Sequence, residues 1–139
     1  MTRSKPRGGR RDSGAVAVEF ALILPILLLI VFGIIDFGRM LNAQITLTQA
    51  AREGARWAAL GQSGVAARVT AAAPGMTPGP TTTVLSSCPA NAAVGAYAEV
   101  RASYTFNFVT PFGAISTMIG GPSYGTMNLQ STARFRCGG

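Results

Sequence analysis

The ionisable and nucleophilic residues of this chain limit the chemistry that it can perform. Its 139 residues include five carboxylates and two cysteines but no histidine. Without histidine, neither a Ser-His nor a Cys-His nucleophile pair can be built. Two cysteines alone also supply too few ligands for a zinc site. We therefore expect a protein that is not an enzyme and that holds neither a metal ion nor a cofactor.

The positions of the carboxylates also argue against a catalytic pair. Glu19 and Asp36 lie in or beside a long apolar run, whereas Glu53 and Glu99 fall on a predicted helix and a predicted strand. Two carboxylates can hydrolyse a glycosidic bond that they flank, but nothing around Glu53 and Glu99 indicates a pocket. We interpret these two residues as solvated surface charges.

Glu19 is unusual because it is the one charged residue in the apolar run of residues 15–35. As a helix this run spans roughly 32 Å, close to the hydrocarbon thickness of a bilayer. Five of the twelve basic residues precede Gly14, which predicts a cytoplasmic N-terminus. At that end of the span a glutamate can reach water, and its burial then costs little.

A second interpretation of Glu19 begins with Gly14. A protease that cuts after Gly14 would leave Ala15 as the new N-terminus and Glu19 as the fifth residue. The carboxylate could then meet the amine of a neighbouring chain displaced along an assembly axis. Low dielectric would strengthen that pair and fix its register. The residues alone leave both interpretations open.

The two cysteines, Cys88 and Cys137, lie at the ends of predicted strands. If this part of the chain is outside the cell, an oxidising compartment favours a disulfide between them. Closing a loop of about 50 residues contributes roughly 4 kcal/mol in the chain-entropy model. The alternative is a pair of free, buried thiols.

One long helix over residues 15–60 would carry Glu19, Asp36 and Glu53, with its first half in lipid and its second half in water. In the second half, small and apolar residues recur at intervals of three and four. The members of this stripe are Ala43, Leu47, Ala50, Ala51, Gly54 and Ala58. We expect Ala50, Gly54 and Ala58 to form a packing face that a second element approaches closely.

After residue 60 the hydrophobic pattern is no longer that of one continuous helix. Residues 65–73 are compatible with a short helical turn, and residues 74–80 are rich in proline and glycine, as in a linker. Residues 81–88 are β-branched, while residues 97–109 and 126–137 alternate with period two. We therefore predict an α+β fold, in which a long N-terminal helix, membrane-spanning and then exposed and amphipathic, packs on a small antiparallel β-sheet.

The predicted organisation has five parts: a basic leader (1–14), a transmembrane helix (15–38), an amphipathic helical continuation (39–73), a linker (74–80) and a small extracytoplasmic β domain (81–139). The basic residues concentrate in the leader, and no basic face with stacking aromatics follows it. The net charge of +7 therefore does not indicate a nucleic-acid partner.

Two segments carry a resemblance to a known family. Gly14-Ala15-Val16-Ala17-Val18-Glu19-Phe20 resembles the processing site of type IV pilin-like proteins, with glycine before the cut and glutamate at the fifth mature position. The run GAVAVEFALILPILLLIVFGIIDFGR, followed by LTQAAREGARWAA at residues 47–59, resembles the TadE-like family of tight-adherence (Flp) pilus proteins. The resemblance covers residues 10–60, and the rest of the chain is similar only in character.

The resemblance implies a pseudopilin that prepilin peptidase cleaves between Gly14 and Ala15 and that assembles through Glu19. Its partners would be other pilins and pseudopilins, the pilus assembly machinery and membrane lipid. The chain would span the bacterial cytoplasmic membrane once, with a cytoplasmic N-terminus and an extracytoplasmic C-terminal domain, and be retained there or incorporated in a pilus. Asp36 aligns with a commonly acidic position, and we interpret it as a helix-surface pair with Arg39.

Two other functions remain open at this point. The chain could be an uncleaved single-pass envelope protein whose extracytoplasmic domain binds a partner. It could also be a secreted β domain that signal peptidase releases. The N-terminal residue of the mature chain differs among the three hypotheses.

Overall fold

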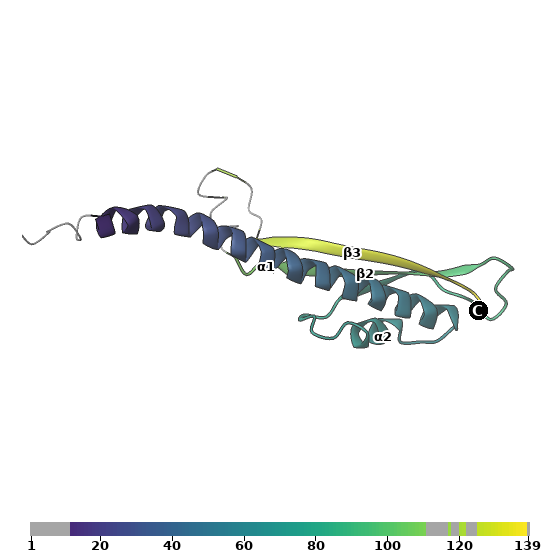
Figure 1. Ribbon diagram of the computed structural model, residues 1–139. Helices are drawn as coiled ribbons and strands as arrows, with labels where there is room; N and C mark the ends of the chain where they lie inside the picture. Colours follow the sequence, from purple (N-terminus) through teal and green to yellow (C-terminus); the bar gives the residue numbers. More distant parts are fainter. Residues whose placement is uncertain (1–11, 111–116, 118–119, 122–124, 139) are drawn as a thin grey trace, which may run out of the picture. The chain divides into compact units, whose positions relative to one another are not determined.

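The long helix α1 runs from Asp12 to Ala59 (Figure 1). The computed structural model describes residues 12–110, 117, 120–121 and 125–138, so most of the basic leader lies outside the described residues. The chain divides into two compact units, Met1–Ile35 and Asp36–Gly139, and α1 contributes to both. By length and composition α1 is the one described helix that can cross a membrane.

Apart from Glu19, the α1 residues from Ala15 to Ile35 are apolar, and most of them are exposed. Most large apolar side chains between Val16 and Ile35 are exposed, and Leu22 has a relative exposure of 70%. An apolar surface of this extent is unfavourable in water, at roughly 25 cal/mol per Å². A lipid or protein environment around this stretch removes that cost, as expected for a membrane-spanning segment.

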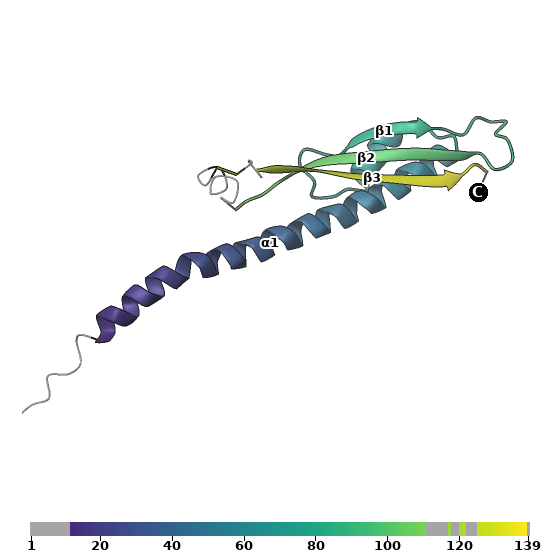
Figure 2. The ribbon, with the colours of Figure 1, turned by 90° about the horizontal axis from the view of Figure 1, so that it is seen from above.

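The second unit contains a three-stranded antiparallel sheet in the order β1-β2-β3 (Figure 2). Its strands are β1 (Thr81–Ser86), β2 (Tyr97–Asn107) and β3 (Thr126–Arg136). The β2–β3 pairing is regular from Tyr97↔Arg136 to Asn107↔Thr126. The β1–β2 pairing shifts register between Val84 and Ser86. These strands and the long helix confirm the predicted α+β fold.

A short helix, α2 (Val65–Ala71), follows α1 and lies on the same face of the sheet (Figures 1 and 2). The reversal between the two helices uses Gly61 and Gly64, with φ angles of 67° and 78°. These are left-handed conformations that glycine adopts without a Cβ penalty. The indole Nε1 of Trp57 donates a hydrogen bond to the backbone oxygen of Ser63 at 2.9 Å, which fixes this turn.

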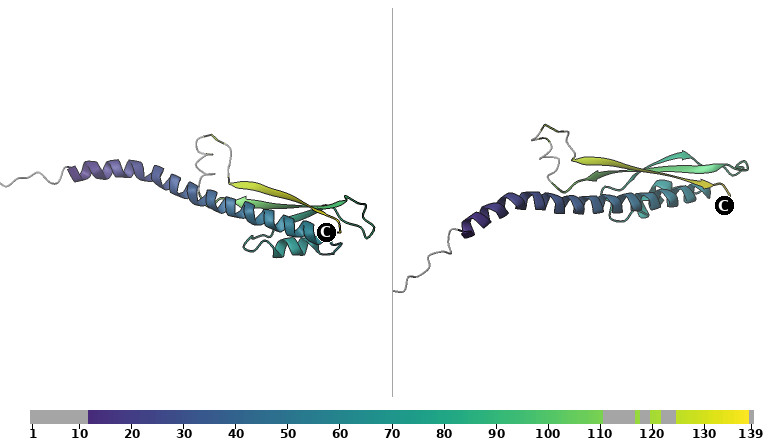
Figure 3. Two further views of the ribbon diagram at one scale, coloured as in Figure 1. Left: turned by 45° about the vertical axis from the view of Figure 1, so that its right-hand side comes forward. Right: turned by 45° about the horizontal axis from the view of Figure 1, so that its top comes forward.

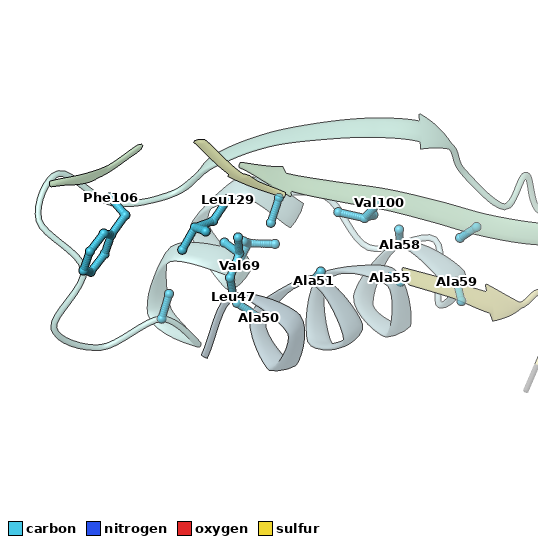
Figure 4. Packing of buried hydrophobic residues seen from close by; sticks show 13 residues of the cluster. Leu47, Ala50, Ala51, Ala55, Ala58, Ala59, Val69, Val100, Phe106 and Leu129 are labelled. Atoms are coloured by element: carbon cyan, nitrogen blue, oxygen red, sulfur yellow. The ribbon is translucent and has the colours of Figure 1, made fainter. Parts of the chain in front are cut away.

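The hydrophobic core lies between α1, α2 and the inner face of the sheet (Figure 4). Eight of its members among the described residues are alanines; the larger ones are Leu47, Val69, Val100, Phe106 and Leu129. Small side chains let the helix backbone approach the strands closely, but each contributes little buried area. The core is therefore thin, and stability must also come from other sources.

A disulfide supplies one of those sources. Cys88 and Cys137 are bonded, with their Cα atoms 5.6 Å apart and 49 residues between them in sequence. Cys137 also donates its backbone N–H to the oxygen of Ala96 at 2.9 Å. The bridge ties the segment after β1 to the end of β3, which lies near the end of α1 in both views of Figure 3.

Candidate functional site

The first candidate site is the start of α1, where Gly14 and Ala15 flank the predicted cleavage bond. Helix α1 begins at Asp12, so this bond lies in the first helical turn. A Cβ added to Gly14 would meet no heavy atom within 4 Å. The absence of a side chain at Gly14 is therefore not required by packing in the described chain.

Glu19 lies one turn further along α1 and is exposed. The described part of the chain provides no hydrogen-bond or ion-pair partner for its carboxylate. From Ala15 to Glu19 the helix rises about 6 Å. In a chain cut after Gly14, a neighbour shifted by about that length along the axis would bring its N-terminal amine level with the carboxylate.

Asp36 is the second candidate site, and it is a junction and not a simple surface pair. The predicted pair exists, because Nη1 of Arg39 donates to Oδ1 of Asp36 at 3.0 Å. However, Asp36 has a relative exposure of only 3%. Its carboxylate also accepts bonds from the chain just after β2, so the surface interpretation of Asp36 was wrong.

The additional donors come from two consecutive residues. Oδ1 of Asp36 accepts the backbone N–H of Val109 at 3.2 Å, and Oδ2 accepts the backbone N–H of Thr110 at 2.9 Å. The Thr110 hydroxyl donates to Oδ2 at 2.6 Å. Charge-assisted bonds of this kind are about twice as strong as neutral ones. Asp36 therefore fastens the end of β2 to α1, where the second unit begins.

The packing face on α1 holds both α2 and the sheet. Ala50, Gly54 and Ala58 are all buried. A Cβ on Gly54 would overlap Cγ2 of Val69 on α2 and would lie 3.3 Å from Cγ1 of Val100 on β2. Glycine at this position is thus required by the close approach of two neighbouring elements.

Glu53 and Glu99 are not free surface charges, contrary to their sequence interpretation. Arg68 of α2 donates to Oε1 of Glu53 through Nη2 at 2.6 Å and Nε at 3.0 Å. This bond, opposed by burial and assisted by the charges of Arg68 and Arg56, lowers the pKa of Glu53 below its ordinary value. Glu99 pairs with Arg134 at 3.1 Å.

These carboxylates are engaged in ion pairs between or along elements, and no group of three potential metal ligands occurs among the described residues. The sequence signal for the Glu53 pair was weak, because Arg68 lies fifteen residues away on a separate helix. The arrangement can fasten elements and present a free carboxylate at Glu19. It contains no assembled catalytic pair in the part of the chain that the structure describes.

Comparison with known proteins is informative for the helical part of the chain. No curated protein and no solved structure matches the chain. The family model described as TadE-like protein matches residues 14–56. This segment begins at Gly14, contains Glu19 and Asp36, and extends through Gly54. Residues 14–56 therefore carry the TadE-like family pattern, which confirms the resemblance seen in the sequence.

Proposed function

We propose that this chain is a pilin-like membrane subunit of a Tad (Flp) pilus system, a pseudopilin or minor pilin. Prepilin peptidase would cut it between Gly14 and Ala15, and Glu19 would then direct its assembly with other pilins. The observation that carries the proposal is the TadE-like match, which starts at Gly14 and includes the exposed apolar stretch of α1.

Three further observations support the membrane arrangement. The basic residues before Gly14 favour a cytoplasmic N-terminus. The apolar side chains that follow are exposed along α1. The Cys88–Cys137 bridge is typical of a domain in an oxidising compartment. Together they favour a single span in the bacterial cytoplasmic membrane with the disulfide-bonded unit outside.

Processing is tested by replacing Gly14 with leucine. The cut bond lies in the first turn of α1, so cleavage requires local unwinding and entry of extended backbone into a narrow protease cleft. A leucine side chain would obstruct that entry, and the chain should keep its leader. Gly33→Leu is the matched control, because a Cβ there also meets no atom within 4 Å. Normal trimming of Gly14→Leu would contradict a peptidase that requires glycine before the cut.

Assembly is tested separately at Glu19. Glu19→Gln removes the charge beyond the cut bond, so leader removal should continue. If the carboxylate pairs with the Ala15 amine of a neighbour, incorporation with the major pilin should fall at least tenfold. Glu19→Asp keeps the charge and should retain most incorporation. Normal co-purification of a correctly trimmed Glu19→Gln protein with the pilin would remove the pairing role.

One observation favours a second candidate. Because the Gly14–Ala15 bond is helical, the same chain would also suit an uncleaved single-pass envelope protein with an extracytoplasmic binding domain. In that case wild-type protein from native membranes keeps its leader, and Gly14→Leu has the same mass as wild type apart from the substitution.

A further inference from the structure

A small polar pocket lies between α1, the segment after α2 and β2, at the end of the second unit where α1 enters it. Its volume is about 200 Å³, enough for several waters or one phosphate-sized group. Its polar lining comes from Arg39, Asn42, Thr46 and Tyr104. The lining contains a guanidinium, an amide and two hydroxyl groups but no acidic side chain.

Arg39 is held in position by two contacts. Its Nη1 donates to Asp36 at 3.0 Å, and its guanidinium carbon lies 5.4 Å from the centroid of the Phe106 ring. The side chain is nevertheless 47% exposed. A guanidinium has five N–H donors, so most of them remain available for a ligand.

Other polar groups in the pocket are also available. Within the described residues, the side chains of Asn42 and Tyr104 have no hydrogen-bond partner of their own. The Thr46 hydroxyl is already occupied, because it donates to the backbone oxygen of Asn42 at 2.9 Å. The pocket therefore combines one positive group with an amide and a phenol that can donate hydrogen bonds. Such a set of donors suits an anion with several oxygens.

The position of the pocket along α1 favours a lipid headgroup as the source of that anion. Arg39 follows Ile35 by four residues, or about 6 Å of helix. Asn42 lies about 10 Å beyond Ile35, and because helical Cα–Cβ bonds tilt toward the N-terminus, its side chain reaches back toward Arg39. A bilayer has a hydrocarbon core of about 30 Å and a total thickness of about 40–45 Å. If residues 15–35 fill the core, Arg39 reaches the level of the phosphate groups in the outer leaflet.

We propose that the pocket binds the phosphate of an anionic phospholipid headgroup through Arg39, Asn42 and Tyr104. The guanidinium of Arg39 also stacks over the ring of Phe106, which lies at the opposite end of the core cluster from Ala59 (Figure 4). The bound lipid fixes the height at which the second unit sits on the membrane surface. This inference rests on the membrane-spanning part of the proposed function and extends it to a specific lipid contact.

The test uses the full chain in neutral detergent and native mass spectrometry with short-chain phosphatidylglycerol. Arg39→Gln should raise the lipid concentration for half-saturation about tenfold, and Tyr104→Phe about threefold. Arg52→Gln is the matched charge control, because Arg52 is exposed on the same helix about 20 Å further on. Tyr97→Phe is the matched phenol control, since Tyr97 lies on the other face of β2.

Equal lipid binding by Arg39→Gln and Arg52→Gln would overturn the proposal, and so would equal binding of uncharged diacylglycerol with the same chains. Complete displacement of the lipid by millimolar inorganic phosphate would assign the pocket to a free anion instead. Tyr104→Phe keeps the test valid if Arg39→Gln does not fold. Carbonate extraction of the membranes from which the chain is purified separates failure of the membrane proposal from failure of the lipid inference. If carbonate extracts the wild-type chain, the membrane proposal is refuted. If the chain stays integral and Arg39→Gln binds the lipid as well as wild type does, only the lipid inference is refuted.

Discussion

Replacement of Gly54 by alanine tests the close packing of α1 against α2 and the sheet. In an exposed helix this change stabilises by roughly 1 kcal/mol, because glycine is a poor helix former. Here the new Cβ would overlap Cγ2 of Val69 and approach Cγ1 of Val100 at 3.3 Å. Both valines are fully buried and have restricted χ1 rotation, so they cannot easily move aside.

Overpacking of this kind costs roughly 1–3 kcal/mol. After subtraction of the gain in helix propensity, Gly54→Ala should lower the free energy of unfolding by up to about 2 kcal/mol. Denaturant unfolding of the full chain in detergent can measure this, with fluorescence of the single tryptophan as the probe. Trp57 is bonded to Ser63, and Arg68 lies 5.2 Å from its ring centroid, so it reports on the α1–α2 junction.

Two further variants separate overlap from other effects. Gly38→Ala is the matched control, because a Cβ there meets no atom within 4 Å, and it should not destabilise. In a Val69→Ala background the overlapping methyl is absent, so Gly54→Ala should become neutral or stabilising. If Gly54→Ala stabilises the wild-type chain, or costs the same in both backgrounds, steric overlap with Val69 does not decide its effect.

Three other predictions concern the contacts that hold the second unit together. Replacing both Cys88 and Cys137 by serine should remove roughly 4 kcal/mol of stability, seen as a large fall in the denaturant midpoint, and an unchanged midpoint would contradict it. Asp36→Asn should cost roughly 1.5–3 kcal/mol and speed amide hydrogen exchange at Val109 and Thr110, with Glu99→Gln as a control that leaves those amides protected. Because the pKa of Glu53 is lowered from 4.5, its stabilising pair is fully present above pH 4.5 and is lost as the pH falls through the lower folded value. The stability difference between wild type and Glu53→Gln should therefore shrink below pH 4.5, and a difference that grows there would contradict the sign.

Local patterns predicted much of this fold correctly. The apolar run and the small-residue stripe indicated one long helix, and period-two alternation indicated the strands that became β2 and β3. These signals are local, because helix and strand faces repeat every few residues. The same patterns placed Cys88 and Cys137 at strand ends, from which the disulfide followed once the compartment was assumed.

Contacts between distant segments could not be predicted in this way. The Asp36–Thr110 bonds join residues 74 positions apart, and no periodicity connects them. Glu53 was interpreted as a surface charge because Arg68 belongs to a separate short helix. The register in which α2 brings Val69 against Gly54 likewise depends on the turn at Gly61 and Gly64. In each case tertiary packing decides the role of a residue whose local sequence is uninformative.

The mass of the mature chain tests processing at Gly14 without any substitution. Full-length protein is produced with its native secretion machinery, extracted from membranes and analysed intact and after peptide mapping. We expect a chain that begins at Ala15, with its disulfide intact. A chain that begins at Met1 or Thr2, or at a residue beyond the apolar run, would contradict processing at Gly14.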